Sequence, residues 1–224
     1  MTSGGEAQKD AIAVLTSGGL DSAILVADLS RQHRHVYPIY IRAALQWEAV
    51  ELAYLQRFLE AVARPTLEPL VILDQPVADL YGSHWSMTGR NVPDAATPDE
   101  AVYLPGRNLL LVLKALLWCH LHGVPTLALA VLCGNPFPDA SDEFFRRFAD
   151  VVGAALKDRL IVIRPYGHLH KHDVLIRGRG LPLEWTFSCI RPVDGKHCGQ
   201  CNKCAERRKA FADAGWTDPT AYAS

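Results

Sequence analysis

Short runs rich in valine, isoleucine and leucine alternate with amphipathic stretches along most of the chain. Within the runs, consecutive positions are mostly apolar, which is typical of strands that are covered on both faces. The amphipathic stretches repeat their apolar residues at the spacing of a helix with one buried face. The pattern predicts strands at residues 12–16, 36–41, 68–73, 126–132 and 160–163, and helices at residues 21–30, 47–62, 107–122, 142–156 and 171–178.

This order of elements predicts an α/β fold with a doubly wound, mostly parallel sheet of five strands. Right-handed crossovers bring the loops that follow parallel strands to one edge of the sheet. We expect the loop after the first strand and residues 135–139, after the fourth strand, to meet at that edge. Residues 74–105 lack clear periodicity and contain four prolines, and we interpret this long segment as a cover over the site.

The character of the sequence changes near residue 180, where the alternation of strands and helices stops. From Thr186 onward the chain is rich in cysteine, and a last helix is predicted near residues 202–214. We therefore predict a main unit over residues 1–180 and a small C-terminal unit over residues 181–224 that packs on it.

Composition and charge argue against several classes of protein. The formal net charge is −1, which provides no global basic field, so direct binding of nucleic acid is not expected. The longest apolar region, residues 109–133, is interrupted by charged residues, glycine and proline, so no membrane span or membrane partner is expected. The first ten residues lack the features of a signal peptide, and a cytoplasmic protein is predicted. The apolar residues 109–118 could serve a homodimer or form a core helix.

The candidate phosphate site is the segment between the first predicted strand and the first predicted helix. The amides at the start of a helix have no intrahelical partner, and the helix dipole favours an anion there. Gly18 and Gly19 allow the backbone to approach a bound group closely, and Asp21 beside a phosphate is explained by a bridging Mg²⁺. The alternative is an ordinary glycine turn. The candidate nucleotide-binding residues are Thr16, Ser17, Gly18, Gly19, Leu20, Asp21 and Ser22.

Four of the six cysteines lie near the C-terminus in overlapping C-x-x-C steps. Four thiolates complete a tetrahedral Zn²⁺ site and leave no open ligand position, so the predicted zinc is structural. An iron–sulfur cluster or redox-active thiols are the alternatives. The predicted ligands are Cys189, Cys198, Cys201 and Cys204, whereas Cys119 and Cys133 are interpreted as buried core residues.

Three segments together resemble one known family. The residues Ser17–Ser22 are similar to the pyrophosphate loop of the ATP-pyrophosphatase (PP-loop) superfamily. With Tyr103–Asn108 and the segment Ser188–Arg208, the chain resembles the QueC or ExsB family of that superfamily, the 7-cyano-7-deazaguanine (preQ0) synthases. Weaker matches are Gln46–Leu52 and Phe137–Phe144.

The resemblance implies a fold of the adenine nucleotide alpha hydrolase type and a ligase that forms C–N bonds for queuosine biosynthesis. Such an enzyme converts 7-carboxy-7-deazaguanine and ammonia to the nitrile through an adenylated carboxylate, with ATP and a structural zinc. The implied catalytic residues are Asp21, Ser22, Arg107 and Lys171, and the implied substrate-binding residues are Gln46, Glu48, Arg107, Asn108, Phe137, Asp139 and Glu143.

The residues themselves leave alternatives open. Arg107 could bind a phosphate or a carboxylate in bidentate fashion, or cap a helix at the surface. Lys171 could touch the phosphates or be a solvated helix residue. Asp139 or Glu143 could accept hydrogen bonds from a purine-like edge with Phe137 stacked on the ring, whereas Glu143 could equally favour a helix dipole.

Two departures from the family pattern bear on the substrate. Glu48 stands where the family has a histidine, and Ala140–Asp142 replaces a Cys-Arg-Pro triplet. A diverged enzyme that makes an amide or a conjugate of a related acid therefore stays open. A tRNA-modifying or thiolating enzyme and a non-catalytic, nucleotide-binding zinc module are further alternatives.

Overall fold

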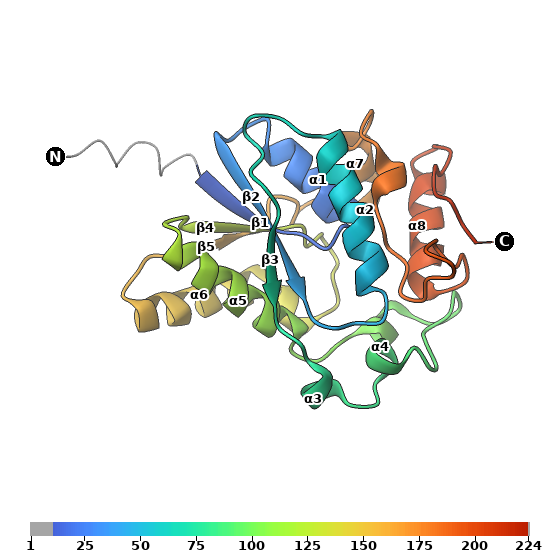
Figure 1. The fold of residues 1–224 in the computed structure, drawn as a ribbon, viewed down its shortest axis with the longest axis horizontal. Helices are drawn as coiled ribbons and strands as arrows, with labels where there is room; N and C mark the ends of the chain where they lie inside the picture. Colours follow the sequence, from blue (N-terminus) through green and yellow to red (C-terminus); the bar gives the residue numbers. More distant parts are fainter. Residues whose placement is uncertain (1–10, 224) are drawn as a thin grey trace.

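The computed structural model describes residues 11–223 and contains a sheet of five parallel strands in the order β3-β2-β1-β4-β5 (Figure 1). Every neighbouring pair of strands is parallel, which confirms the predicted doubly wound α/β fold. The first ten residues of the predicted main unit lie outside the described residues. The strands are β1 (Ala11–Leu15), β2 (His35–Arg42), β3 (Val71–Asp74), β4 (Thr126–Leu129) and β5 (Ile161–Ile163).

The helices follow the amphipathic pattern closely, and each of the six predicted helices begins and ends within one residue of its predicted bounds. Two short helices inside the long segment 74–105 were not predicted, because four residues are too few to show a period. The helices are α1 (Leu20–Leu29), α2 (Glu48–Ala61), α3 (Ala78–Tyr81), α4 (Trp85–Thr88), α5 (Arg107–Leu121), α6 (Asp142–Leu156), α7 (Lys171–Arg177) and α8 (Asn202–Asp213).

Two strands are shorter than predicted by two residues or more, and β5 is shorter by one. β4 ends at Leu129 because its partner Leu15 is the last residue of β1, which then turns into the glycine loop. Cys133 consequently lies in the loop beyond β4 and is exposed, so its predicted burial is wrong. The third strand begins only at Val71 because Pro69 has no N–H to donate to the ladder.

The sheet is covered by helices on both faces, which explains the continuous apolar runs in its strands (Figure 1). Ile12 and Val14 of β1 belong to a core formed with α1, α2, α7 and α8. Ala13, between them, belongs to a second core formed with α5 and α6. The strand order reverses between β1 and β4, and ligands of open α/β sheets bind at the carboxyl ends of strands beside such a reversal. The glycine loop follows β1 at that place.

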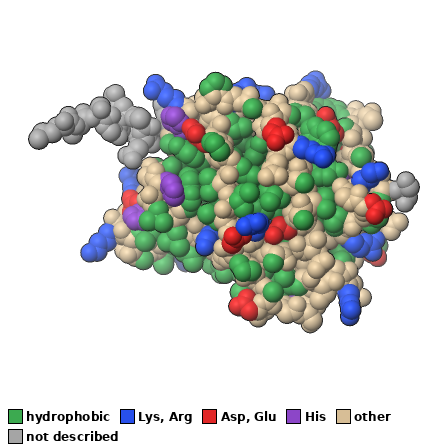
Figure 2. All heavy atoms as spheres, viewed as in Figure 1, with side chains coloured by type: hydrophobic (Ala, Val, Ile, Leu, Met, Phe, Trp, Pro, Cys, Tyr) green, Lys and Arg blue, Asp and Glu red, His purple; other side chains and the backbone are tan. Residues whose placement is uncertain are grey.

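The outer face of α5 carries an apolar stripe. Leu109, Leu113, Leu117 and Leu121 are exposed and four residues apart, so they share one side of the helix. Figure 2 shows hydrophobic side chains over a broad part of the face where β3 and α5 lie. The homodimer, which the sequence left open beside a core helix for this stretch, stays a prediction. No helix among residues 11–223 is long and apolar enough to cross a membrane.

Candidate active site

The glycine loop connects β1 directly to α1 and is held in shape by hydroxyl groups. Ser22 Oγ donates to the carbonyl of Gly19 at 3.2 Å and accepts the N–H of Ser17 at 3.2 Å. Thr16 Oγ1 donates to the same hydroxyl at 3.3 Å. No side chain caps the N-terminus of α1, so the first amides of the helix remain available to an anion. The side chain of Leu20 is buried in the core, so only its backbone could contact a ligand at the loop.

Gly18 fixes the path of this loop. Its φ of +75° lies in the left-handed region, and a Cβ there would lie 3.1 Å from Leu55 Cβ and 3.3 Å from the Glu51 carbonyl oxygen. The carbonyl of Gly18 accepts the N–H of Phe187 at 2.8 Å. The loop thus packs closely against α2 on one side and is hydrogen-bonded to the C-terminal segment on the other.

Asp21, in the first turn of α1, makes one strong contact and has one free oxygen. Its Oδ2 accepts a hydrogen bond from Lys171 Nζ at 2.6 Å. Its Oδ1 is buried without a hydrogen-bond partner in the described structure. An unsatisfied buried carboxylate oxygen beside a phosphate-binding helix terminus is a suitable ligand for a hard divalent cation.

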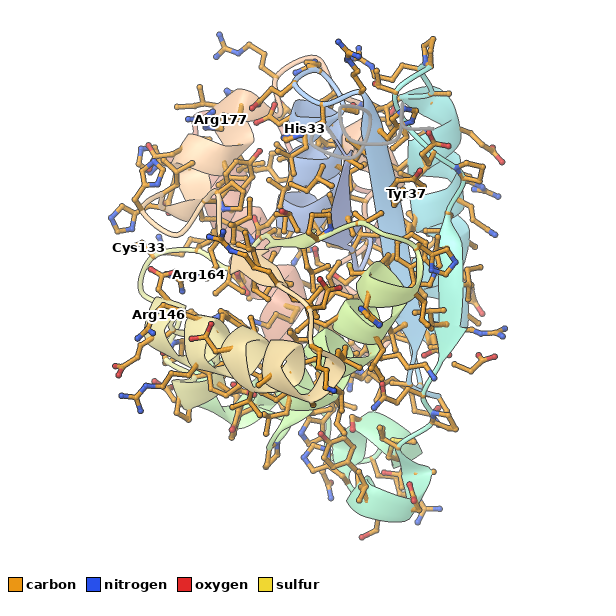
Figure 3. All side chains as sticks on the ribbon, turned by 90° about the vertical axis from the view of Figure 1, so that its left-hand side faces the viewer. His33, Tyr37, Cys133, Arg146, Arg164 and Arg177 are labelled. Carbon is orange, nitrogen blue, oxygen red and sulfur yellow. The ribbon has the colours of Figure 1, made fainter. Side chains whose placement is uncertain are left out.

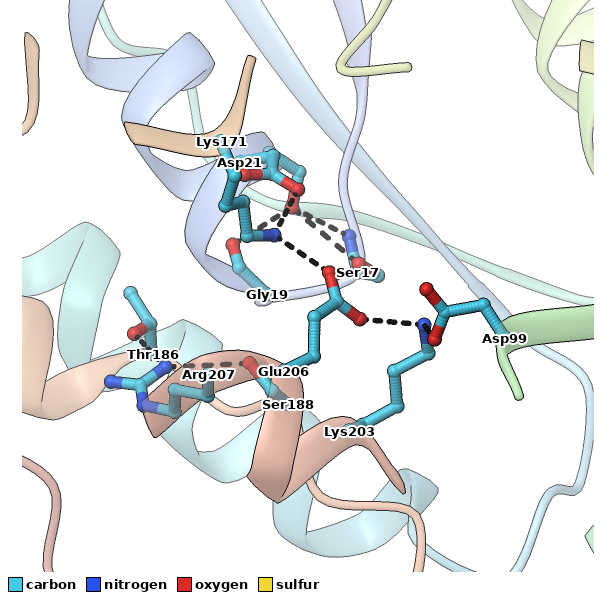
Figure 4. A network of polar contacts seen from close by, with 11 residues as sticks. Ser17, Gly19, Asp21, Asp99, Lys171, Thr186, Ser188, Lys203, Glu206 and Arg207 are labelled. Carbon is cyan, nitrogen blue, oxygen red and sulfur yellow. Dashed lines mark hydrogen bonds and ion pairs between the residues drawn. The ribbon is translucent and has the colours of Figure 1, made fainter. Parts of the chain in front are cut away.

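Lys171 begins α7 and belongs to a chain of alternating charges (Figure 4). Its Nζ lies 3.4 Å from Glu206 Oε1, and the other oxygen of Glu206 lies 2.6 Å from Lys203 Nζ. Burial alone would lower the pKa of Lys171, but the carboxylates of Asp21 and Glu206 outweigh it and raise that pKa. Burial likewise opposes ionisation of Glu206, yet the two lysines lower its pKa to about 2.

Glu206 and Lys203 were not predicted as site residues, because Lys203 lies between two cysteines of the cluster and Glu206 lies two residues after Cys204, where the sequence indicates only metal binding. Nothing in their spacing shows that one face of α8 turns toward the glycine loop. Both side chains line a cavity with Ser17, Gly19 and Asp21.

Two cavities adjoin the glycine loop. One, of about 190 Å³, lies against the ends of β1 and β4, and its wall includes Leu129–Val131. The other, of about 260 Å³, lies against the C-terminal segment and the long segment 74–105. The residues that line both cavities are Ser17, Gly19, Asp21, Glu51 and Arg107. The two cavities therefore meet at the loop.

Arg107 begins α5 directly after Gly106, whose φ of +73° ends the preceding turn. Its Nε is buried and has no hydrogen-bond partner among the described residues. A guanidinium with an unsatisfied donor at the junction of two cavities is suited to a carboxylate or a phosphate. Because its Nε is buried, Arg107 does not match the alternative in which it caps a helix at the surface.

The second cavity has aromatic walls. Trp47 and Trp85 stack with ring centroids 5.7 Å apart at an interplanar angle of 19°. Phe137 stacks on Tyr103, with centroids 4.9 Å apart. Trp85 comes from the segment 74–105, and Trp47, Trp85 and Phe137 all line this cavity. Flat apolar walls of this kind suit a planar heteroaromatic ring.

Glu51 is a buried carboxylate that sequence reasoning passed over. It lies three residues after Glu48 on α2, and its Oε2 accepts a hydrogen bond from Tyr40 Oη at 2.7 Å. Burial, as the largest effect, raises the pKa of Glu51 to about 7, against the opposing effects of Tyr40 and Arg107. The helical spacing of Glu51 from Glu48 and its place after a buried strand were the available signals.

Several predicted substrate residues have partners in the protein instead. Glu48 Oε2 accepts the backbone N–H groups of Ala43, at 2.5 Å, and Ala44, at 3.0 Å, and so holds the turn after β2. Gln46 is exposed and donates to the carbonyl of Met87. Glu143 is exposed on α6 and pairs with Arg147 at 2.7 Å. None of these three residues, Gln46, Glu48 and Glu143, lines either cavity.

Asn108 and Asp139 bind each other across the edge of the sheet. Asp139 Oδ2 accepts the backbone N–H of Asn108 at 3.2 Å, and Asn108 Nδ2 donates to the carbonyl of Asp139 at 3.1 Å. Asp139 is therefore a cap for α5 and holds the loop after β4 against it. Asn108 also lines the first cavity.

The departure at Ala140–Asp142 has a structural explanation. Ser141 is the N-cap of α6, and its Oγ accepts the N–H of Phe144 at 3.1 Å. Arg164, which is labelled in Figure 3, follows β5. It binds both oxygens of Asp142 and donates to the carbonyl of Ala140. Ser141 thus serves the helix start, and Arg164 holds this segment from another element.

The four cysteines predicted as ligands come together. Their sulfur atoms lie within 4.8 Å of one another, and all four side chains are buried. The Sγ atoms of Cys198 and Cys204 are 4.0 Å apart, and those of Cys189 and Cys201 are 3.9 Å apart. A tetrahedron with Zn–S bonds of about 2.3 Å has edges of about 3.8 Å, so the cluster fits Zn²⁺.

Arg207, on α8, connects this cysteine cluster to the wall of the second cavity. Its side chain is fully buried and donates to Thr186 Oγ1 at 2.9 Å, to Ser188 Oγ at 3.3 Å and to the carbonyl of Leu183 at 2.9 Å. Cysteines of the cluster share one hydrophobic core with Trp47 and Phe187. The cluster therefore supports the cavity wall rather than opening into it.

Comparison with known sequences gives a consistent set of relatives. The family model described as "Queuosine biosynthesis protein QueC" matches residues 11–215. Proteins named "7-cyano-7-deazaguanine synthase" from Solidesulfovibrio magneticus and Xanthomonas oryzae pv. oryzae are 31% and 34% identical to this chain. These alignments cover 93% and 94% of this chain and 94% and 96% of the two relatives.

A solved structure shares the fold. The chain aligns with "Crystal structure of a 4-thiouridine synthetase - RNA complex with bound ATP" at a TM-score of 0.52 and 13% identity. The alignment covers 92% of this chain and 51% of that one. This similarity shows that the two chains share a fold.

Proposed function

The chain belongs to the QueC family of queuosine biosynthesis proteins, and on that premise we propose that it is an ATP-dependent 7-cyano-7-deazaguanine synthase. The observation that carries the proposal is the meeting of two cavities at the glycine loop. One cavity takes ATP and the other takes the acid, so that the α-phosphate and the carboxylate react where they meet.

ATP lies with its phosphates on the glycine loop and its adenine toward the ends of β1 and β4. The open amides of α1 and the hydroxyl of Ser17 donate to the phosphates. Lys171 adds a positive charge opposite them. The backbone and side chains of Leu129–Val131 form the wall for the base.

The free oxygen of Asp21 fits Mg²⁺, which would neutralise phosphate charge when bound. Asp21 would hold the cation through Oδ1, while its Oδ2 is paired with Lys171 in the free site. Ser22, next in the helix, stays hydrogen-bonded within the loop and keeps its shape.

The acid lies in the second cavity with its ring against Trp47, Trp85 and Phe137. Its carboxylate points to Arg107, whose unsatisfied Nε is a donor at the junction. This placement turns the carboxylate oxygen toward the α-phosphate. Asn108 follows Arg107 in the chain. Its backbone N–H donates to Asp139, and this hydrogen bond fixes the start of α5.

The reaction forms a C–N bond, which makes the protein a ligase. A carboxylate is a poor electrophile, and transfer of AMP to it, with release of pyrophosphate, supplies a leaving group. Ammonia then displaces AMP to give the amide, and loss of water gives the nitrile. The site contributes mainly orientation and stabilisation of the phosphoryl charge.

Further parts of the proposal concern the rest of the molecule. Four cysteines hold a structural Zn²⁺, and the C-terminal residues 181–224 form a small unit that packs on the main unit of residues 1–180. The partners are the acid and ammonia, in a cytoplasmic enzyme.

The test is mass spectrometry of the products. Purified protein is incubated with ATP, Mg²⁺, ammonium and 7-carboxy-7-deazaguanine, and a parallel sample lacks ammonium. We expect the nitrile together with AMP, and no nitrile without ammonium.

Other products would change the assignment. AMP with an amide or a conjugate as the end product would indicate a diverged member of the family. No AMP and no loss of the acid, with protein shown to contain zinc, would refute the assigned substrate. RNA binding that weakens with salt would favour a tRNA-modifying enzyme.

A further inference from the structure

Glu51 is the carboxylate at the junction that forms no salt bridge among the described residues, although the Arg107 guanidinium acts on it from α5. It lines both cavities, and its side chain is buried. Unlike Asp21 and Glu206, it forms no ion pair among residues 11–223; its hydrogen bond comes from the neutral hydroxyl of Tyr40. A buried carboxylate held this way retains the ability to take up a proton.

The proposed reaction requires a proton acceptor at this junction. Ammonia carries three N–H bonds and the nitrile nitrogen carries none, so every proton on that nitrogen must leave it. The first leaves when ammonia attacks the acyl adenylate, and the other two leave during dehydration of the amide. A base near the reacting carbon therefore assists the chemistry.

The other acidic groups near the loop are occupied. Asp21 is paired with Lys171, and Glu206 lies between Lys171 and Lys203. Glu48 holds two backbone amides, and Asp139 caps α5. Glu51 is the carboxylate that combines access to both cavities with freedom from an ion pair.

We propose that Glu51 is the base that accepts the proton of ammonia during amide formation. The nitrogen lone pair attacks the acyl carbon, the C–N bond forms, and the C–O bond to AMP breaks with its electron pair on the phosphate oxygen. One N–H proton passes to the carboxylate of Glu51, which returns it to water after the product leaves. This proposal rests on the proposed function of the site.

The surroundings of Glu51 suit this role. Tyr40 faces it from β2, Arg107 from α5, and Trp47 and Glu48 from its own part of the chain. Burial raises the pKa of Glu51 to about 7, while the Tyr40 hydrogen bond and Arg107 limit the rise. A base whose pKa lies near the working pH is ionised in a large fraction of molecules and still binds a proton well.

The test separates the two halves of the reaction in Glu51→Gln. Adenylation is measured as the acid-dependent exchange of pyrophosphate into ATP, a reaction that involves no ammonia. Formation of the amide and the nitrile is measured by mass spectrometry. We expect exchange within about threefold of the unchanged protein and product formation reduced by about 10²-fold or more, the usual contribution of a general base. Glu60→Gln, an exposed change on the same helix, is the matched control.

Tyr40→Phe provides a second, independent readout. Removing the hydroxyl removes a hydrogen bond that favours the charged carboxylate, so the pKa of Glu51 rises. The rise of product formation with pH should then shift to a more alkaline range, while the pH profile of the exchange reaction stays in place.

Three outcomes would overturn the proposal: product formation by Glu51→Gln at the rate of the unchanged protein, equal losses of exchange and product formation, or an unshifted pH profile in Tyr40→Phe. Failure of the proposed function is a different result, because the unchanged protein would then form neither amide nor nitrile.

Discussion

Lys171 Nζ lies 2.6 Å from Asp21 Oδ2 and so joins the first turn of α7 to the first turn of α1. The lysine cancels the charge of a carboxylate that would otherwise repel phosphates at the glycine loop. An incoming triphosphate competes with Asp21 for the lysine, and a divalent cation competes with the lysine for Asp21. The contact between Lys171 and Asp21 therefore belongs to the free site, and binding of ATP and Mg²⁺ would replace it with contacts to the ligands.

Lys171→Met should reduce adenylation by about 10²-fold, because it removes the cation opposite the phosphates and leaves Asp21 unopposed. Methionine retains much of the apolar stem, so the fold should persist. The measurement is the acid-dependent exchange of pyrophosphate into ATP. Lys209→Met, an exposed change on α8, is the control. Exchange by Lys171→Met at the control rate would exclude a phosphate role for this lysine.

Glu206→Gln should lower the pKa of Lys171, because Glu206 is one of the two carboxylates that raise it. The protonated lysine is the active form, so its loss at high pH should begin earlier in the variant. The alkaline limb of the exchange reaction, which lies above the ordinary lysine pKa of 10.5 in the unchanged protein, should move toward neutral pH in the variant. An unmoved limb would show that Glu206 does not act through Lys171.

The sequence predicts the framework of the site better than its charges. The glycine loop, Arg107 and the four cysteines were predicted because each has a local pattern: a turn between strand and helix, a helix start, or a repeated spacing. These patterns depend on neighbours in the chain, which the sequence displays directly.

Glu51 has only its helical spacing from Glu48 as a local signal, and Glu206 has none. Their importance arises from burial and from partners on other elements: Tyr40 Oη of β2 lies 2.7 Å from Glu51, and Lys171 Nζ of α7 lies 3.4 Å from Glu206. Glu48 illustrates the converse, because its place in a family-like segment suggested substrate contact, while its carboxylate is taken by two backbone amides. Side-chain partners of this kind follow from the tertiary structure and not from local spacing.

Removal of zinc should destabilise the C-terminal segment and with it the wall of the second cavity. Cys201→Ser should lose the metal and lower the unfolding free energy by several kcal/mol, because structural zinc contributes its binding energy to folding. Metal content is measured by mass spectrometry of the metal and stability by thermal unfolding. Cys133→Ser, an exposed cysteine outside the cluster, should retain one zinc per chain. A zinc-free protein that unfolds at the same temperature as the loaded protein would contradict this assignment.

Gly18→Ala should impair both folding and adenylation, because the new Cβ would press on Leu55 and on the backbone of Glu51 while φ stays at +75°. We expect a loss of about 1 to 3 kcal/mol in the free energy of unfolding. Gly180→Ala is the matched control, since its φ is +80° and nothing lies within 4 Å of the added Cβ. Denaturant unfolding of the two variants separates crowding from backbone strain. Equal losses in both would show that the loop has room for a side chain.

Glu51 should make the stability of the protein depend on pH. Burial raises its folded-state pKa from the ordinary 4.5 to about 7, so between these values the folded protein holds a proton that the unfolded chain has released. The contribution of Glu51 to stability therefore falls as pH rises from about 4.5 to about 7. Glu51→Gln removes this dependence, and its stability relative to the unchanged protein should improve by about 1 to 3 kcal/mol between pH 5 and 8.

Denaturant unfolding at the two pH values measures this difference. Any pH-independent effect of replacing the carboxylate, including the altered bond to Tyr40, cancels in the comparison. Glu60→Gln, on the exposed side of α2, should show no such change. A constant difference between Glu51→Gln and the unchanged protein would mean that Glu51 ionises in the fold as it does in water. A growing difference would show that the protein keeps a destabilising carboxylate at the junction of the two cavities, as expected of a residue retained for proton transfer.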